Sequence, residues 1–210
     1  MSLRGLYAIT PDARESAALI ERARAALTAA TPSPVRMLQY RNKLADPASR
    51  RREAAALAAL CRAQRTLFVV NDDLELALQV GADGVHLGRD DGDLAGARAR
   101  LGDRLLGASC YNELERARTA RAAGADLVAF GSVFGSATKP GAVRAPLAVL
   151  GQARSLGIPV VAIGGITLHN AAEAIRAGAD LVAVISDLFD APDVAARARA
   201  YARLFEKESP

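Results

Sequence analysis

Four polar clusters each follow directly on a short apolar run, and their residue types could bind a metal ion and phosphate groups. They are QYRNK (39–43), NDD (71–73), RDD (89–91) and SATK (136–139). An apolar run of five or six residues is typical of a buried strand, which cannot hold charges inside it. The charged side chains must therefore lie beyond the strand ends, and we expect them to share one face of the sheet.

Two isolated acids, Asp72 and Asp91, follow consecutive apolar runs and are candidate ligands of Mg²⁺. This ion commonly takes one or two protein carboxylates and completes its shell with water and substrate phosphate oxygens. Arg41, Lys43 and Lys139 supply positive charge for a polyphosphate beside it. The alternative is that both acids cap the helical stretches that follow them, but the facing basic groups favour the metal. The adjacent acids are interpreted as caps or solvated charges: Asp73 and Asp90.

Eight strand-like runs, separated by alanine-rich helical stretches, must position these clusters. The runs lie at residues 6–9, 35–39, 67–70, 84–87, 105–109, 127–130, 160–163 and 181–185. Helical spacing of apolar residues is clear at 16–29, 47–63, 113–123 and 170–177. Parallel strands joined by helical crossovers form an open doubly wound sheet or a closed barrel. Eight units in 210 residues favour an α/β fold, a compact (β/α)8 TIM barrel, as a single domain over 1–210.

The tripeptide Gly-Ala-Asp occurs at 81–83, 124–126 and 178–180, each time between a helical stretch and a strand. Glycine in this position ends a helix in a left-handed conformation, and the aspartate turns the chain into the next strand. The repeat precedes the fourth, sixth and eighth strands, so its acids lie at the entry end of the barrel, opposite the usual active face. We interpret these acids as structural.

A second anion site is predicted where the sixth, seventh and eighth strands end. The segment FGSVFGSATKP (130–140) combines glycines, hydroxyl residues and a lysine, so its backbone N–H groups can approach an anion closely. The next strands end in IGGI (163–166) and VIS (184–186), where barrels commonly hold a substrate phosphate. An ordinary flexible loop is the alternative. Two anion sites with a metal at only one imply two phosphorylated substrates, one of which loses diphosphate.

Composition excludes several other classes of protein. With 51% hydrophobic residues the chain can bury a sizeable core, and no apolar stretch approaches the roughly 20 residues of a membrane helix. The N-terminus runs into strand-like sequence with no signal-peptide layout, which predicts a cytoplasmic protein without a membrane partner. The net charge of +4 comes from arginines spread along helical stretches, and there is no Trp, so no nucleic-acid partner is expected.

The histidines and cysteines are assigned no chemistry. His86 lies within the fourth strand and is interpreted as a polar core residue held by a neighbour, and His169 lies near a helix cap without an evident partner. Cys61 and Cys110 show no metal-ligand spacing and are interpreted as small apolar fillers. No nucleophile with a base is evident, so the chemistry must rest on positioning and charge.

Taken together, the motifs resemble the thiamine phosphate synthase family. The match runs from LYAITP (6–11) through QYRNK, VND, HLGRDD, GAS, FGSVFGSATKP and IGGI to VAVIS (182–186). The resemblance implies a transferase that joins 4-amino-2-methyl-5-hydroxymethylpyrimidine diphosphate to 4-methyl-5-(2-hydroxyethyl)thiazole phosphate, giving thiamine phosphate and diphosphate. It also implies a Mg²⁺-assisted dissociative displacement, in which diphosphate leaves and the thiazole nitrogen attacks the resulting cation. Such a reaction needs no protein nucleophile.

Carried over by position, the resemblance implies a role for each polar cluster. The pyrimidine diphosphate would contact Gln39, Tyr40, Arg41, Asn42, Lys43, Asn71, Ser109 and Lys139. The thiazole phosphate would contact Ser136, Ala137, Thr138, Gly165, Ile185 and Ser186. Catalytic roles would fall to Lys139, Arg41, Lys43 and Ser109, and one Mg²⁺ would be held by Asp72 and Asp91.

Two residues depart from the family pattern. Ser136 stands where threonine is expected and keeps the hydroxyl group, whereas Arg89 stands where glutamine is expected and adds a charge beside the metal loop. Neither departure removes a proposed metal ligand. The effect of Arg89 on the local electrostatics is left open by the sequence.

Two other functions fit the same barrel. A thiazole tautomerase relative would need a proton-transfer group and has little use for a carboxylate pair and a diphosphate clamp. A non-catalytic barrel that binds a phosphorylated precursor would not need intact metal ligands with both lysines, Lys43 and Lys139. We therefore expect the synthase, with two small phosphorylated substrates, and leave a homo-oligomer open.

Overall fold

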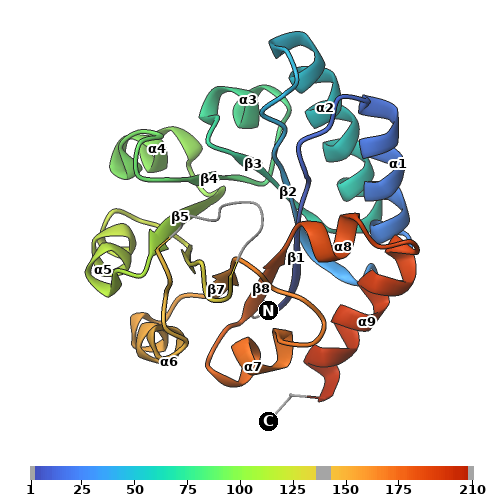
Figure 1. Ribbon diagram of the computed structural model, residues 1–210. Coiled ribbons are helices and arrows are strands. Elements are labelled where there is room, and N and C mark those ends of the chain that lie inside the picture. Colours follow the sequence, from blue (N-terminus) through green and yellow to red (C-terminus); the bar gives the residue numbers. More distant parts are fainter. Residues whose placement is uncertain (1–2, 136–142, 208–210) are drawn as a thin grey trace.

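Eight parallel strands close into a barrel in the computed structural model, which describes residues 3–135 and 143–207 (Figure 1). The strands are β1 (Gly5–Ile9), β2 (Val35–Tyr40), β3 (Leu67–Asn71), β4 (Gly84–Leu87), β5 (Leu105–Tyr111), β6 (Leu127–Phe130), β7 (Val160–Ile163) and β8 (Leu181–Val184). Each strand pairs with the next in the sequence, and β1 closes the ring by pairing with β8, Leu6 opposite Val182. The predicted fold class is confirmed.

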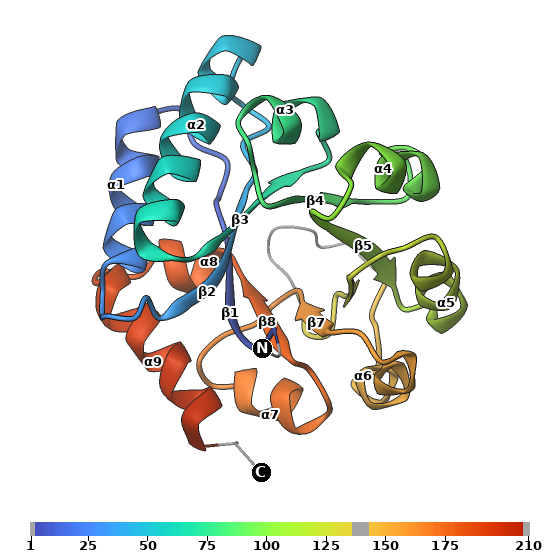
Figure 2. The ribbon, with the colours of Figure 1, turned by 180° about the vertical axis from the view of Figure 1, so that it is seen from behind.

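Helices surround the barrel on its outside (Figures 1 and 2). They are α1 (Ser16–Leu27), α2 (Pro47–Gln64), α3 (Leu74–Gln79), α4 (Leu94–Leu101), α5 (Leu114–Ala122), α6 (Ala148–Ala153), α7 (Ala171–Arg176), α8 (Ser186–Phe189) and α9 (Val194–Lys207), with a short 3-10 helix, η1 (Arg154–Leu156), after α6. The four helical stretches that were predicted correspond to α1, α2, α5 and α7, whose bounds agree to within two residues at each end. The short helix α8 lies between β8 and α9. Barrels of this type frequently have a short extra helix at this place, and its N-terminus contributes to a phosphate site.

Most residues on both faces of the strands are buried, which explains why the strands are largely apolar. Along β1, Leu6 and Ala8 face the surrounding helices, while Tyr7 and Ile9 face the barrel interior, because side chains alternate along a strand. The small side chains of alanine-rich helices let those helices pack closely on the barrel. The interior layer contains Tyr7, Ile9, Met37, Val69, Leu127, Ala129, Val161, Leu181 and Ala183.

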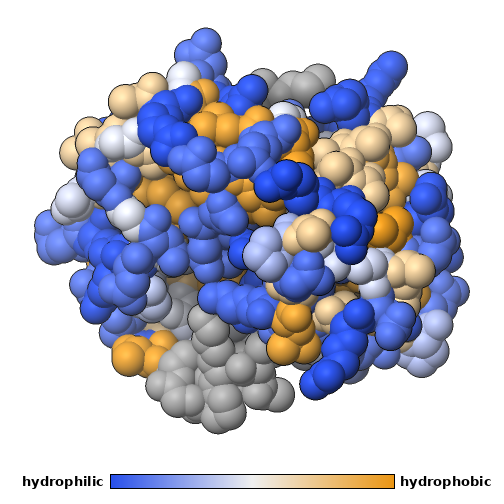
Figure 3. Space-filling model, turned by 90° about the horizontal axis from the view of Figure 1, so that it is seen from above, coloured by the Kyte–Doolittle hydropathy of each residue, from blue (hydrophilic) through white to orange (hydrophobic). Residues whose placement is uncertain are grey.

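The face of the molecule around α2 and α3 is largely hydrophilic (Figure 3). Seen from the side that lies uppermost in Figure 1, around α2 and α3, blue hydrophilic residues cover most of the face, with smaller apolar areas between them (Figure 3). This agrees with the interpretation of the spread arginines as solvated helix faces. Within the part of the chain that the structure describes, no helix is both long enough and apolar enough to cross a membrane.

The three Gly-Ala-Asp repeats tie neighbouring strands together at the entry end of the barrel. Each glycine has a positive φ, +62°, +92° and +117° in chain order, as a left-handed helix end requires. Each aspartate carboxylate accepts a backbone N–H from the preceding strand: Asp83 from Phe68 (2.7 Å), Asp126 from Leu106 (2.8 Å) and Asp180 from Val160 (2.9 Å). The structural interpretation of these acids is confirmed.

Candidate active site

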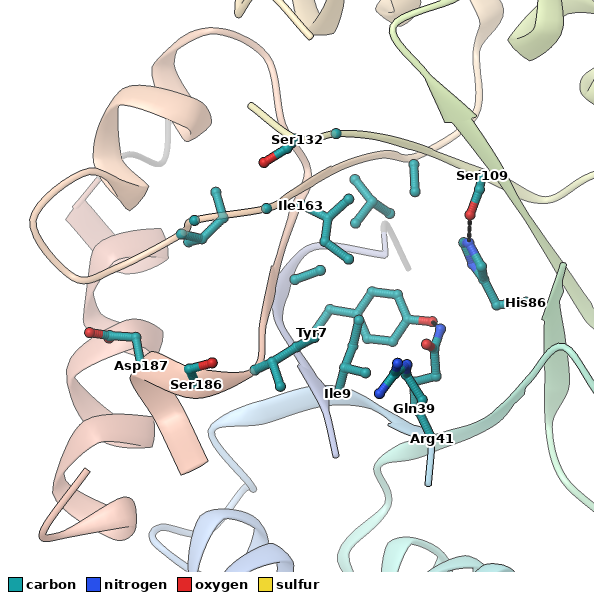
Figure 4. A pocket seen from close by; sticks show the side chains of 18 of the residues that line it. Tyr7, Ile9, Gln39, Arg41, His86, Ser109, Ser132, Ile163, Ser186 and Asp187 are labelled. Atoms are coloured by element: carbon teal, nitrogen blue, oxygen red, sulfur yellow. Dashed lines mark hydrogen bonds between the residues drawn. The ribbon is translucent and has the colours of Figure 1, made fainter. Parts of the chain in front are cut away.

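A cavity of about 390 Å³ opens where the strands end, and every strand or the loop after it supplies part of its lining. Seven of the residues predicted to bind substrate line it: Gln39, Arg41, Asn71, Ser109, Gly165, Ile185 and Ser186. Figure 4 shows that Tyr7, Gln39 and Arg41 lie on one side of this cavity, whereas Ser132, Ser186 and Asp187 lie across it. The fold therefore brings together residues that are far apart in the sequence.

Tyr7 and Gln39 form a polar pair on the interior face of β1 and β2. Gln39 Nε2 donates to Tyr7 Oη at 2.6 Å, and both side chains are buried. Burial raises the pKa of Tyr7 far above its usual range, and the hydrogen bond from Gln39 opposes this only in part. The phenol is therefore neutral, and it fixes the orientation of the Gln39 amide.

His86 and Ser109 form a second pair, on β4 and β5. His86 Nε2 lies 2.9 Å from Ser109 Oγ, and both side chains line the cavity (Figure 4). Burial lowers the pKa of His86 to about 4, although the charge of Asp91 acts in the opposite direction. The imidazole is therefore neutral at physiological pH. The prediction that a neighbour holds His86 is confirmed, and that neighbour is Ser109.

The basic loop after β2 is latched to the loop after β1. Thr10 Oγ1 accepts from Arg41 N and donates to Arg41 O, both at 2.8 Å. The Asp12 carboxylate accepts from Lys43 N at 2.6 Å and pairs with the Arg41 guanidinium at 2.8 Å. These contacts fix the backbone of both basic residues beside the cavity.

Two predicted contact residues of this loop, Tyr40 and Asn42, point their side chains away from the cavity. Tyr40 Oη and Asn42 Nδ2 donate to the carboxylate of Glu53, at 2.7 and 3.0 Å, and Ser16 Oγ donates to it as well. Glu53 is buried in α2, so its three hydrogen bonds compensate for the loss of hydration. Side chains alternate along the strand, so Gln39 and Arg41 face the cavity while Tyr40 and Asn42 anchor the loop.

The two acids expected to bind a metal lie next to each other. Asp72, at φ +63°, pairs with Lys43 Nζ at 3.2 Å, and Asp91 accepts from Gly88 N at 2.8 Å. Burial, and then a hydrogen bond with Asp72, raise the pKa of Asp91, although Gly88 and Lys43 lower it. Two carboxylates this close repel one another when both are ionised. A divalent cation would relieve that repulsion, so the donor set fits one.

No group of three or more His, Cys, Asp or Glu side chains gathers around one point within 3–135 and 143–207. A site with two carboxylates needs further oxygen ligands from water or from a substrate. Asp73, the neighbour of Asp72, accepts from Leu76 N at 2.9 Å and caps α3, which confirms its interpretation as a cap.

Glycines form the opposite wall. Gly164 and Gly165 adopt φ +97° and +64°, and a Cβ on Gly165 would clash with the backbone carbonyl of Gly135. Phe134 N donates to Gly164 O at 3.0 Å, so the segment after β6 is paired with the segment after β7. Asn170 Nδ2 donates to Gly165 O at 2.9 Å and holds this turn from behind. Four predicted residues lie outside the described part of the chain: Ser136, Ala137, Thr138 and Lys139.

Several lining residues were not among the individually predicted site residues, among them Tyr7, Tyr111, Ser132 and Asp187. For Tyr7 the signal was present, because strand alternation places it with Ile9 on the interior face. Asp187 belongs to α8, where it accepts from Arg197 Nη1 (2.7 Å) and Tyr201 Oη (2.6 Å) of α9. Those two partners follow only after an intervening turn, so their approach depends on the tertiary fold.

The fold and the place of the cavity define the chain as a (β/α)8 barrel enzyme with its site at the carboxyl ends of the strands. A sequence model of one such family, described as thiamine monophosphate synthase, matches residues 6–188. The chain therefore belongs to the thiamine monophosphate synthase family.

Individual relatives agree with this assignment. The chain is 57% identical over 204 residues to the thiamine-phosphate synthase of Chromobacterium violaceum, covering 97% of each chain. It is also 57% identical over 205 residues to that of Azoarcus sp., covering 97% of this chain and 98% of the relative. The structure of thiamine phosphate pyrophosphorylase from Pyrococcus furiosus superposes with a TM-score of 0.85 at 34% identity, covering 98% of this chain and 97% of the other.

Proposed function

We propose that this protein is a thiamine-phosphate synthase that joins 4-amino-2-methyl-5-hydroxymethylpyrimidine diphosphate to 4-methyl-5-(2-hydroxyethyl)thiazole phosphate. The observation that carries the proposal is the division of one cavity into two unlike walls. On one side Arg41 lines the cavity, and the loops that follow β2, β3 and β4 carry Lys43, Asp72 and Asp91, which contact one another but are not themselves lining residues. On the other side the lining is glycine backbone after β6 and β7. Two phosphorylated substrates, of which one loses diphosphate, need this division.

The charged wall would hold the pyrimidine diphosphate. Arg41 and Lys43 would contact the diphosphate. The buried Gln39 and the half-buried Asn71 and Ser109 would contact the pyrimidine ring, since they belong to the strands that form the floor of the cavity. Lys139 takes part in diphosphate binding by its place in the family motif. Within the basic loop, Tyr40 and Asn42 contribute their backbone and the anchoring to Glu53.

The glycine wall would hold the thiazole phosphate. Gly165 lets a phosphate approach the backbone closely, and Ile185 and Ser186 lie beside it where α8 begins. The family motif adds Ser136, Ala137 and Thr138. Neutral backbone donors suit a phosphate that is retained through the reaction, because its charge does not change.

Asp72 and Asp91 would hold one Mg²⁺, for which the adjacent carboxylates are suitable ligands. When bound, the ion neutralises charge that develops on the departing diphosphate. Lys43, which pairs with Asp72 at 3.2 Å, adds a positive charge on the same side. The residues of the charged wall thus stabilise the leaving group and hold it in line.

The reaction proposed is a dissociative displacement. The bond between the pyrimidine methylene and the diphosphate oxygen breaks, the electron pair leaves with diphosphate, and the ring amino group stabilises the cation. The neutral thiazole nitrogen then attacks the methylene. Ser109 is paired with His86, but burial lowers the pKa of this imidazole to about 4, so it is a weak base that is poorly suited to activating the hydroxyl, and this route requires no nucleophile.

The test is to incubate the purified protein with both substrates and Mg²⁺ and to measure thiamine phosphate and diphosphate. We expect equimolar products that form only when both substrates are present. Conversion of the thiazole substrate alone would favour the tautomerase, and tight binding without product would favour the non-catalytic barrel. A cytoplasmic location, one domain over 1–210 and a homo-oligomer stay predictions.

A further inference from the structure

Tyr111, the last residue of β5, borders the cavity two residues beyond Ser109. Its φ is +55°, and the pairing of β5 with β6 shifts register between Ser109 and Tyr111. A positive φ is unfavourable for a bulky side chain and persists only where neighbouring contacts impose it. We therefore expect the contacts of the Tyr111 side chain to impose this backbone conformation.

Two guanidinium groups hold this ring. Arg89 lies 4.9 Å and Arg116 5.7 Å from the ring centroid, within the range of cation–π attraction. Arg116 Nε also donates to Ser109 O at 2.8 Å, and Arg89 forms an ion pair with Glu113. The ring is thus fixed to the strand end that carries Ser109.

The hydroxyl end of Tyr111 rests on the loop that carries Asp91. Tyr111 Oη accepts from Arg89 N at 3.4 Å and lies 3.7 Å from the position of a Cβ on Gly88. Gly88 N in turn donates to Asp91 Oδ2 at 2.8 Å. Tyr111 therefore bridges the strand end at Ser109 and the loop 88–91.

We propose that Tyr111, held by Arg89 and Arg116, is a positioning residue that fixes the Asp91 carboxylate relative to Ser109 and so strengthens binding of the divalent cation and diphosphate. The inference rests on the proposed function, because it takes Asp72 and Asp91 as the cation site. It gives the arginine at position 89 a definite role: its planar group stacks on Tyr111 and pairs with Glu113 instead of facing the metal.

This positioning role and a simple charge effect of Arg89 predict opposite changes in cation affinity when Arg89 is replaced. If Arg89 acted as a bare positive charge beside the cation site, Arg89→Gln would tighten cation binding. If Arg89 acts through Tyr111, the same substitution weakens cation binding because the ring loses one of its two stacked partners. Arg89→Lys separates the two further, since lysine keeps the charge but lacks the planar group that stacks on an aromatic ring.

The experiment is a titration with Mn²⁺ in the presence of inorganic diphosphate, with free Mn²⁺ measured by electron paramagnetic resonance. We expect Arg89→Gln and Arg89→Lys to weaken Mn²⁺ binding by about threefold to tenfold, the scale of one partly exposed cation–π contact and its geometry. Tyr111→Leu should weaken it at least as much, and Tyr111→Phe should weaken it less than Tyr111→Leu, because the ring and its two stacked guanidinium groups are kept while the hydroxyl that accepts from Arg89 N is lost. The matched control is Arg118→Gln, which breaks an exposed pair with Glu115 away from Tyr111 and should change nothing.

Further measurements separate a positioning role from general damage. The KM for the thiazole phosphate should stay unchanged in these variants, and adding Arg89→Gln to Tyr111→Leu should cost nothing more, because both act through one ring. If Tyr111→Leu does not fold, the Arg89→Lys result decides alone. Tighter Mn²⁺ binding by Arg89→Gln, or wild-type binding by Arg89→Lys, would overturn the inference. Asp72→Asn separates the two failures: if it leaves Mn²⁺ binding intact, the cation site itself is wrong.

Discussion

The charged wall and the glycine wall of the cavity differ in composition: the first consists of charged side chains and the second of glycine backbone. The charged wall after β2, β3 and β4 depends on side chains whose directions are fixed by second residues, as Asp12 fixes Arg41 and Asp72 pairs with Lys43. The glycine wall depends on the path of the backbone, because Gly164 and Gly165 approach the segment after β6 too closely for a side chain. Each wall should therefore fail in its own way: the first when a charge or its anchor is removed, the second when volume is added.

The energetic reason for the difference lies in what each wall must do. A leaving diphosphate gains charge during the reaction, so oriented charges that act most strongly in the transition state raise the rate. A retained phosphate keeps its charge, so it only needs a site of the right shape with backbone donors. Substitutions in the charged wall should lower kcat, whereas those in the glycine wall should raise a single KM.

The largest effect is expected at the carboxylate pair. Asp72→Asn or Asp91→Asn should lower kcat/KM by about a hundredfold or more, the scale for removing one group that stabilises developing charge. The fold should be retained, because both acids lie in loops and their repulsion is relieved. The measurement is steady-state kinetics at several Mg²⁺ concentrations, with circular dichroism as the fold control. Wild-type rates in either variant, or in excess chelator, would exclude a metal role for the pair.

Much of the charged wall could be predicted from the sequence, because its chemistry is carried by residue type. The residue types of Asp72, Arg41 and Lys43 alone indicate cation and phosphate binding, and their position after apolar runs places them at one end of the barrel. Direction is harder to predict. Tyr40 and Asn42 belong to the same motif, yet both turn toward Glu53, a residue of α2 whose burial depends on the packed helix.

The glycine wall and Tyr111 show what the sequence could not supply. A glycine pair is common, and its meaning here comes from the carbonyl of Gly135 packed against it, a contact between segments after two different strands. The bridge from Tyr111 to the 88–91 loop likewise depends on a register shift in β5. Neither feature leaves a periodic or compositional trace.

The glycine wall is tested by adding volume. Gly165→Val should raise the KM for the thiazole phosphate by about tenfold or more and change the KM for the pyrimidine diphosphate little, since only the first substrate needs close approach to this backbone. Gly102→Val is the matched control, because Gly102 also has a positive φ (+61°) but open space around its Cβ position. Equal increases in both KM values for Gly165→Val would show that the two walls do not serve separate substrates.

The anchor of the charged wall should have a smaller effect on activity and a clear one on stability. Glu53→Ala leaves the buried donors of Tyr40 and Asn42 without their acceptor, which should lower the free energy of unfolding by about 3 kcal/mol. It should also raise the KM for the pyrimidine diphosphate by loosening the loop. Urea unfolding measures the first effect, and Glu21→Ala, at an exposed ion pair on α1, is the control. Unchanged stability would mean that Glu53 does not anchor the loop.

The smallest expected effect is a pH dependence of stability that comes from His86. This residue belongs to β4, beneath the charged wall. Its pKa of about 4 in the folded state lies below the usual 6.5, so the unfolded chain binds the proton more readily between these values. Stability from this group is therefore complete above pH 6.5 and declines as the pH falls toward 4, by about 2 kcal/mol between pH 7 and 5.

Urea unfolding of wild type and His86→Gln at pH 7 and pH 5 isolates this contribution, because the carboxylates titrate in both proteins and cancel in the difference. The wild type should lose about 2 kcal/mol more than the variant over this interval. His169→Gln, which removes an exposed imidazole, is the matched control. If wild type and His86→Gln lost the same stability, folding would not lower the pKa of His86, and His86 would be protonated in the folded protein at pH 5. It would then present a cation to Ser109 and act as part of the charged wall instead of a neutral support beneath it.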